Sequence, residues 1–172
     1  MGKEIVIAAC VFFATAAAAQ GNGSHYVAVD FSGVKAYWKA VEKGEPVRLP
    51  RSAKHAHAEG CVSVGFSIEA DGKPANLVVL RSGFTDQADR QVIKDVEQRV
   101  VQNLASTRYA AVESNPGRQP VYTYGTYSFS MFAQPAIASD VDKRSDFVRA
   151  ACEIPDFPAA VARGDLVKKT AS

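Results

Sequence analysis

The stretch AEGCVSVGFSIEADGKPANLVVLR, from Ala58 to Arg81, decides the fold of this chain. Two apolar runs flank Asp71-Gly72, a dipeptide that favours the positive backbone angles of a tight hairpin turn. In the first run every second residue is large and apolar, which is typical of a strand with one face in a core; these residues are Val62, Val64, Phe66 and Ile68. The sequence therefore predicts a β-hairpin.

The return strand of this hairpin, Ala75 to Arg81, has a different pattern. Its apolar residues, Leu77 to Leu80, are consecutive rather than alternating. A run of this kind is typical of a strand that is covered on both faces. We therefore expect the return strand to be the central strand of a sheet, and Ser82-Gly83 to begin a loop.

The N-terminus has the pattern of an export signal. Lys3 precedes an apolar run from Ile5 to Ala19 that ends in three alanines before Gln20. This order of a basic residue, an apolar segment and small residues is typical of a signal peptide over residues 1–19. The alternative is a retained anchor helix, although the run is shorter than the roughly 20 apolar residues of a comfortable membrane span.

The cysteines predict one disulfide. Cleavage next to Gln20 removes Cys10 and leaves Cys61 and Cys152 as an even pair in an exported protein. A redox couple is the less favoured interpretation, because no C-x-x-C motif is present to lower a thiol pKa. A Cys61–Cys152 bond would bring the C-terminal helix to the other face or edge of the sheet, since Cys61 alternates with Val62.

Three further segments have helical patterns. Apolar residues at helical spacing predict an amphipathic helix between Ser32 and Lys43, with the single tryptophan, Trp38, as a covering residue, and a short helix follows from Arg51 to Glu59. The clearest helix runs from an N-cap at Asp86, with Asp89 in its first turn, to about Ser106. Its predicted core positions are Val92, Val96, Val100 and Leu104.

The C-terminal part of the chain predicts a third strand and a last helix. Residues Gln119 to Phe132 are rich in aromatic and β-branched residues, and Gly125 within them indicates a bulge. Ser139 and Asp142 give a capping signal for a helix that ends at Cys152, and one more helical turn is expected over residues 159–163.

Composition and motifs give no sign of catalysis. The chain is 47% hydrophobic with a net charge of +2 and interspersed charges, which argues against a nucleic-acid surface. None of the common nucleotide-binding, hydrolase or zinc-protease motifs occurs. His55 and His57 form an H-x-H pair without further spaced ligands, and Glu69 and Asp71 flank the hairpin turn. We therefore expect no enzyme activity, no cofactor and no metal site.

The order of several short motifs resembles the C-terminal domain of TonB-like energy transducers. These motifs are Leu49-Pro50-Arg51-Ser52-Ala53, Glu59-Gly60-Cys61-Val62, Asp71-Gly72-Lys73, Val79-Leu80-Arg81-Ser82-Gly83, Thr107-Arg108-Tyr109-Ala110-Ala111 and Gly117-Arg118-Gln119-Pro120-Val121. The resemblance extends from about Val47 to Phe132. Leu49 replaces the usual tyrosine, and the membrane anchor and Pro-rich spacer of the transducers are not visible.

The resemblance implies an α+β fold in which a small antiparallel sheet has a β-β-α-β core, with added N- and C-terminal helices. It divides the chain into a signal peptide (1–19), a leader with a short helix (20–46), the TonB-C-like domain (47–132) and a helical extension (133–172). The domain would lie in the periplasm, or be anchored to the inner membrane and touch the membrane only if the N-terminal segment is retained.

The implied function is recognition of an extended peptide of an envelope or outer-membrane receptor protein, added as a strand to a sheet edge. The third strand is the candidate edge, and its candidate partner-binding residues are Tyr122, Tyr124, Tyr127 and Phe129. A homodimer is an open alternative arrangement. The alternative function is that of a disulfide-stapled structural or stress-related envelope protein without transducer activity.

Overall fold

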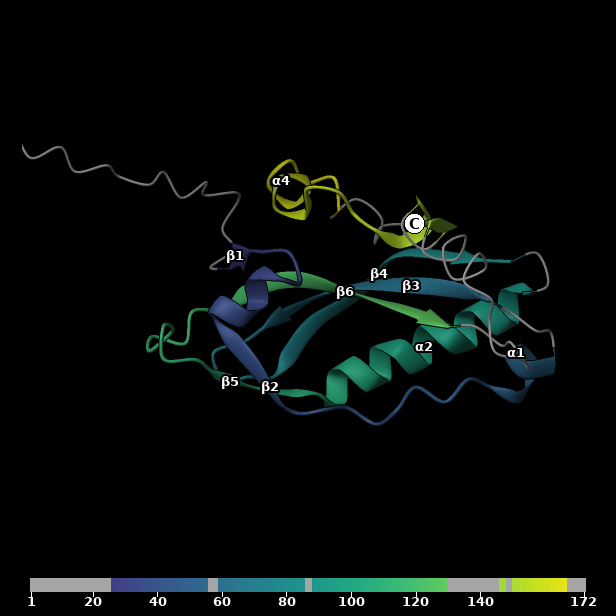
Figure 1. Ribbon diagram of the computed structural model, residues 1–172, viewed down its shortest axis with the longest axis horizontal. Coiled ribbons are helices and arrows are strands. Elements are labelled where there is room, and N and C mark those ends of the chain that lie inside the picture. The colour runs from purple at the N-terminus through teal and green to yellow at the C-terminus, as the bar shows by residue number, and fades with distance from the viewer. Residues whose placement is uncertain (1–25, 56–58, 86–87, 130–145, 148–149, 167–172) are drawn as a thin grey trace, which may run out of the picture.

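The computed structural model describes residues 26–55, 59–85, 88–129, 146–147 and 150–166. Its main sheet has the strand order β1-β6-β3-β4, and a second sheet consists of β2 and β5 (Figure 1). The elements are β1 (Val27–Ala28), the 3-10 helix η1 (Gly33–Ala36), β2 (Trp38–Glu42), α1 (Arg51–His55), β3 (Gly60–Ile68), β4 (Pro74–Phe84), α2 (Arg90–Ser106), β5 (Arg108–Ala111), β6 (Val121–Phe129) and α4 (Phe157–Ala162). The predicted α+β fold with a β-β-α-β core, here β3-β4-α2-β6, is confirmed.

Helix α2 covers one face of the main sheet, which we call the α2 face (Figure 1). The alternating residues of β3 and the i, i+4 residues of α2 form a single buried cluster there, as both patterns predict. The cluster includes Val62, Val64, Phe66, Ile68, Val92, Val96, Val100 and Leu104. The helix begins one turn later than expected, because its N-cap is Asp89, whose carboxylate accepts a hydrogen bond from the Val92 amide (2.8 Å), rather than Asp86.

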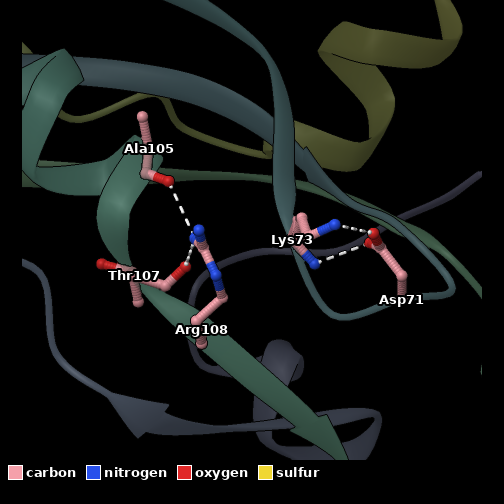
Figure 2. A network of polar contacts seen from close by, with 5 residues as sticks. All are labelled: Asp71, Lys73, Ala105, Thr107 and Arg108. Atoms are coloured by element: carbon pink, nitrogen blue, oxygen red, sulfur yellow. Dashed lines mark hydrogen bonds and ion pairs between the residues drawn. The ribbon is translucent and has the colours of Figure 1, made fainter.

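The turn between β3 and β4 is bonded to the start of β5. Gly72 has a φ of 80°, and a Cβ there would lie 2.1 Å from the Tyr109 carbonyl, so the close approach requires glycine. The Tyr109 amide donates to the Gly72 carbonyl (3.0 Å). Figure 2 shows two separate sets of contacts. Lys73 binds Asp71 across the turn, and the Arg108 guanidinium donates to the Ala105 carbonyl in the last turn of α2 and to the Thr107 carbonyl.

The central strand is β3, and the expectation that the return strand is central was wrong. Strand β3 is fully buried and pairs with β4 on one side and β6 on the other, while β4 lies at the end of the sheet. The apolar run of β4 does reflect cover on both faces, because Val79 packs in the α2-face cluster and Leu80 in a second cluster on the opposite face. Strand β4 also continues through Ser82 and Gly83, which were expected to form a loop.

The C-terminal segment, residues 150–166, covers that opposite face, which we call the C-terminal face. The predicted disulfide is confirmed, since Cys61 and Cys152 are bonded. Residues 150–152 are helical, so the helix ends at Cys152 as expected, and α4 follows close to the predicted last turn. The Ser63 hydroxyl donates to the Cys152 carbonyl (2.6 Å), and Phe157 packs against the rings of Tyr122 and Tyr124.

The expected helix between Ser32 and Lys43 was wrong. Only residues 33–36 form a 3-10 turn, and Trp38–Glu42 is strand β2, paired antiparallel with β5. Trp38 is 3% exposed and donates through its indole to the Gln119 carbonyl (3.1 Å), whereas Val41 is 56% exposed. The pairing with β5, about 70 residues away, overrides a local spacing that also fits a helix.

One smaller expectation was also wrong, and several others concern residues that the structure does not describe. Gly125 does not mark a bulge, because β6 pairs with β3 in continuous register; the irregularities occur between β3 and β4 instead. Helix α1 is described from Arg51 to His55, and residues 56–58 of the expected helix to Glu59 lie outside the described residues. The signal peptide, His25, His57, the end of the third strand and the Ser139–Asp142 capping signal lie outside the described residues.

Candidate functional site

The outer edge of β6 is the feature of the sheet that offers a site. Strand β1 pairs with it in parallel at Val121 and Tyr122 only, and no other described strand continues along this edge. The Tyr122 carbonyl points outward, because it accepts a hydrogen bond from the Val29 amide (3.0 Å). Since alternate residues of a strand direct their amide and carbonyl groups to the same side, those of Tyr124, Thr126 and Ser128 also point outward.

A groove of about 760 Å³ runs along this open edge. One wall is the strand itself, from Tyr124 to Ser128, and the wall on the α2 face comes from the end of β2, the loop after it, the end of α2 and β5. The C-terminal segment contributes Glu153 on the other side. The lining is mainly apolar, with Phe31, Ala40, Pro46, Leu104, Tyr109, Tyr124 and Tyr127, and it includes the charged side chains of Lys43 and Glu153.

The four aromatic residues singled out from the sequence do not form one cluster. Tyr122 and Tyr124 lie on the C-terminal face, where they pack against Phe157 at centroid distances of 5.5 Å and 4.8 Å. Tyr127 and Phe129 lie on the α2 face, where Phe129 packs against Phe84 at 5.7 Å. Only Tyr124 and Tyr127 line the groove, and both are half-buried.

Burial changes the pKa of two tyrosines on β6, Tyr122 and Tyr127, and of Tyr109 on β5. It raises the pKa of Tyr127 to about 12, and the neighbouring Tyr109 phenol adds to this shift. Burial also raises the pKa of Tyr109 and of Tyr122. The Tyr127 hydroxyl donates to the Asn103 side-chain oxygen (3.0 Å), and its raised pKa keeps this phenol a neutral donor at neutral pH.

Three groove residues were missed from the sequence: Phe31, Lys43 and Glu153. Phe31 is 61% exposed in the turn before η1, close to Gly125 of β6. None of the three belongs to a motif. Phe31 and Lys43 lie more than 70 residues before β6 in the sequence, and Glu153 lies more than 20 residues after it. Phe31 gave the one local signal of a groove residue. It stands beside polar turn residues, so no neighbouring apolar residue in its own element covers its side chain.

Other kinds of site are not seen in the described ranges. Within them, no group of three or more His, Cys, Asp and Glu side chains is placed to hold a metal ion. The helices described here are all too short or too polar to cross a membrane. Glu69, which flanks the hairpin turn, accepts hydrogen bonds from Ser67 (2.7 Å) and Tyr26 (2.8 Å) and so ties the turn to the N-terminal segment.

The fold and the groove therefore define a small α+β domain with an open, apolar-lined sheet edge. Residues 45–121 match the family model of the Gram-negative bacterial TonB protein C-terminal. This part of the chain is a TonB C-terminal domain-like unit, as the sequence resemblance indicated. Domains of this family are non-enzymatic binding and transducing domains related to envelope transport. The match ends at the first residue of β6, so most of the groove strand lies beyond it.

Two solved structures are similar to this chain. The TonB C-terminal domain of Pseudomonas aeruginosa is 24% identical, with 58% of this chain and 90% of that chain covered and a TM-score of 0.41. The TonB C-terminal domain of Helicobacter pylori is 22% identical, with 51% of this chain and 71% of that chain covered and a TM-score of 0.36. No match was found among curated proteins.

Proposed function

We propose that this chain is a periplasmic, non-enzymatic protein-binding domain that recognises an extended peptide of an envelope or outer-membrane receptor protein. The peptide pairs as an added strand with the outer edge of β6, between Tyr124 and Ser128. The observation that carries this proposal is the open row of outward backbone groups inside a groove. Such a row supplies affinity through main-chain hydrogen bonds, and the groove walls supply selectivity.

The proposal also assigns a role to each of three parts of the chain. Residues 1–19 are a signal peptide, so the mature protein begins near Gln20 and lies in the periplasm; the disulfide is consistent with that oxidising compartment. Residues 47–132 are the binding domain, and residues 133–172 are an extension held to it. The intact mass of the exported protein tests the first boundary, and a mass that includes Met1 in a membrane fraction would contradict it.

Proline at Thr126 tests strand addition. The substitution removes an outward amide and places a ring in the path of the partner strand. It keeps every backbone hydrogen bond to β3 and loses the side-chain hydrogen bond between Thr126 and Ser63 (2.7 Å). Loss of one such bond weakens binding by about threefold to tenfold. The probe is a seven-residue peptide that alternates valine and threonine, titrated by fluorescence anisotropy.

The matched control is proline at Ser82 on β4. Val62 directs its backbone groups toward β6, so Ser82, its partner on β4, points away from β3 at the opposite edge of the sheet. Ser82→Pro should leave peptide binding unchanged. Circular dichroism checks that both variants fold, and molar mass in solution is measured alongside, because a second copy of the chain could occupy the same edge. Equal binding by the wild type and a folded Thr126→Pro variant would refute the proposal.

One observation favours the alternative of a structural envelope protein. The side chains of Tyr122 and Tyr124 are already packed against Phe157, and β1 occupies the start of the β6 edge. A chain that uses this face only to hold its own C-terminal segment needs no partner. Failure of the wild-type protein to bind any alternating peptide would favour this second function.

A further inference from the structure

We propose that Glu153 is a specificity-determining residue of the groove and selects partner strands that carry basic side chains on the C-terminal face and apolar side chains on the α2 face. This inference rests on the proposed function and adds the chemistry of the partner. It follows from the different composition of the two sides of the groove.

The backbone around Glu153 is fixed relative to β6. Cys152, the preceding residue, is bonded to Cys61, and its carbonyl accepts from Ser63 (2.6 Å). The Ser63 hydroxyl also lies 2.7 Å from the Thr126 hydroxyl, which belongs to the groove strand. On the other side of Glu153, the Ile154 amide donates to the Tyr124 hydroxyl (3.3 Å). The C-terminal segment is thus tied to two of the residues that line the groove.

Glu153 is exposed and lines the groove. Arg81 donates to the main-chain carbonyl of Glu153 (2.8 Å), and no described residue forms an ion pair with the carboxylate. An added strand alternates its side chains between the two faces, so every second side chain would lie on the side of Glu153. A lysine or arginine there gains a charge interaction, whereas a carboxylate is repelled.

The opposite side of the groove favours a different side chain. Leu104, Tyr109 and Tyr127 line the α2 face, and Lys43 is the charged residue of the lining there. A basic side chain on this side would be repelled by Lys43 and would place its charge against apolar surface. The partner that fits both sides is therefore a strand in which apolar and basic residues alternate. It can bind only with its basic side chains on the C-terminal face and its apolar side chains on the α2 face.

Two peptides and two variants test the assignment. The peptides alternate valine with lysine or valine with glutamate over seven residues, and the variants are Glu153→Lys and the matched control Glu113→Lys. Glu113 is exposed, and its substitution changes the net charge equally, but it does not line the groove. Affinities are measured by anisotropy at low and high salt, and the readout is the ratio of lysine-peptide to glutamate-peptide affinity.

Glu153→Lys should lower this ratio by roughly tenfold relative to the wild type, and Glu113→Lys should change it by about twofold or less. The difference between the two variants should shrink at high salt. Equal changes in both variants would overturn the role of Glu153 while leaving strand addition intact. If the wild type binds neither these peptides nor the valine–threonine peptide, both this inference and the proposed function are wrong.

Discussion

The two faces of the main sheet are covered in different ways. On the α2 face, a helix that follows the hairpin in the chain packs its regular apolar stripe on the alternating residues of β3. On the C-terminal face, β3 contributes small and polar residues, and the cover is a short segment attached through a disulfide that spans 91 residues. The comparison indicates that the α2 face supports the fold, whereas the C-terminal face is an addition that shapes the groove.

Removing the disulfide should have the largest effect, and it tests whether the covers of the two faces unfold separately. In the chain-entropy model, a loop of this length constrains the unfolded chain by about 4 to 5 kcal/mol, and strain in the folded state makes this an upper value. We expect Cys61→Ala/Cys152→Ala to lose stability up to this amount in urea unfolding. Hydrogen exchange should show loss of protection in residues 150–166 first, with α2 still protected.

Peptide mapping without reductant provides the control for this prediction, since it should yield one linked Cys61–Cys152 peptide from the wild type. If reduction instead lowers protection equally in α2 and in the C-terminal segment, the two faces are a single cooperative unit and the comparison fails.

Substitution of one phenylalanine on each face tests which face contributes more to global stability. Phe66 and Phe157 are both fully buried, the first on the α2 face and the second on the C-terminal face. Phe66→Ala should cost about 3 to 5 kcal/mol of global stability, because it leaves a cavity in the main cluster. Phe157→Ala should cost less, since its loss is limited to detaching the C-terminal segment locally.

Urea unfolding measures the first effect, and limited proteolysis at residues 150–166 measures the second. A larger global loss for Phe157→Ala than for Phe66→Ala would reverse the assigned roles of the two faces.

The smallest effect comes from one polar group on the α2 face. Thr123 is fully buried, and its hydroxyl has no hydrogen-bond partner among the described residues. Burying an unpaired hydroxyl is unfavourable, so Thr123→Val should stabilise the fold by about 1 kcal/mol. Thermal unfolding would detect this gain, and Ser63→Ala, which removes a bonded hydroxyl on the other face, should destabilise instead. A destabilised Thr123→Val variant would mean that the hydroxyl has a partner.

The amino-acid sequence by itself determined the α2 face, the hairpin and the cysteine pair. The period-2 run of β3 and the i, i+4 stripe of α2 are local patterns, and each matches the geometry of its own element. The pairing of Cys61 with Cys152 followed from counting the cysteines that would remain after cleavage of the predicted signal peptide. The ordered motifs from Leu49 to Val121 also carried the family resemblance that the match to residues 45–121 confirms.

Only the tertiary structure decided the strand order and the groove. Trp38 sits in a strand because β5 pairs with it, and β4 is covered on both faces because the C-terminal segment reaches it, so neither environment is encoded within the element itself. The groove joins Lys43, β6 and Glu153, three parts of the chain that share no local pattern. Local periodicity reports which face of an element is buried, but long-range pairing determines which edge stays open and which side chains surround it.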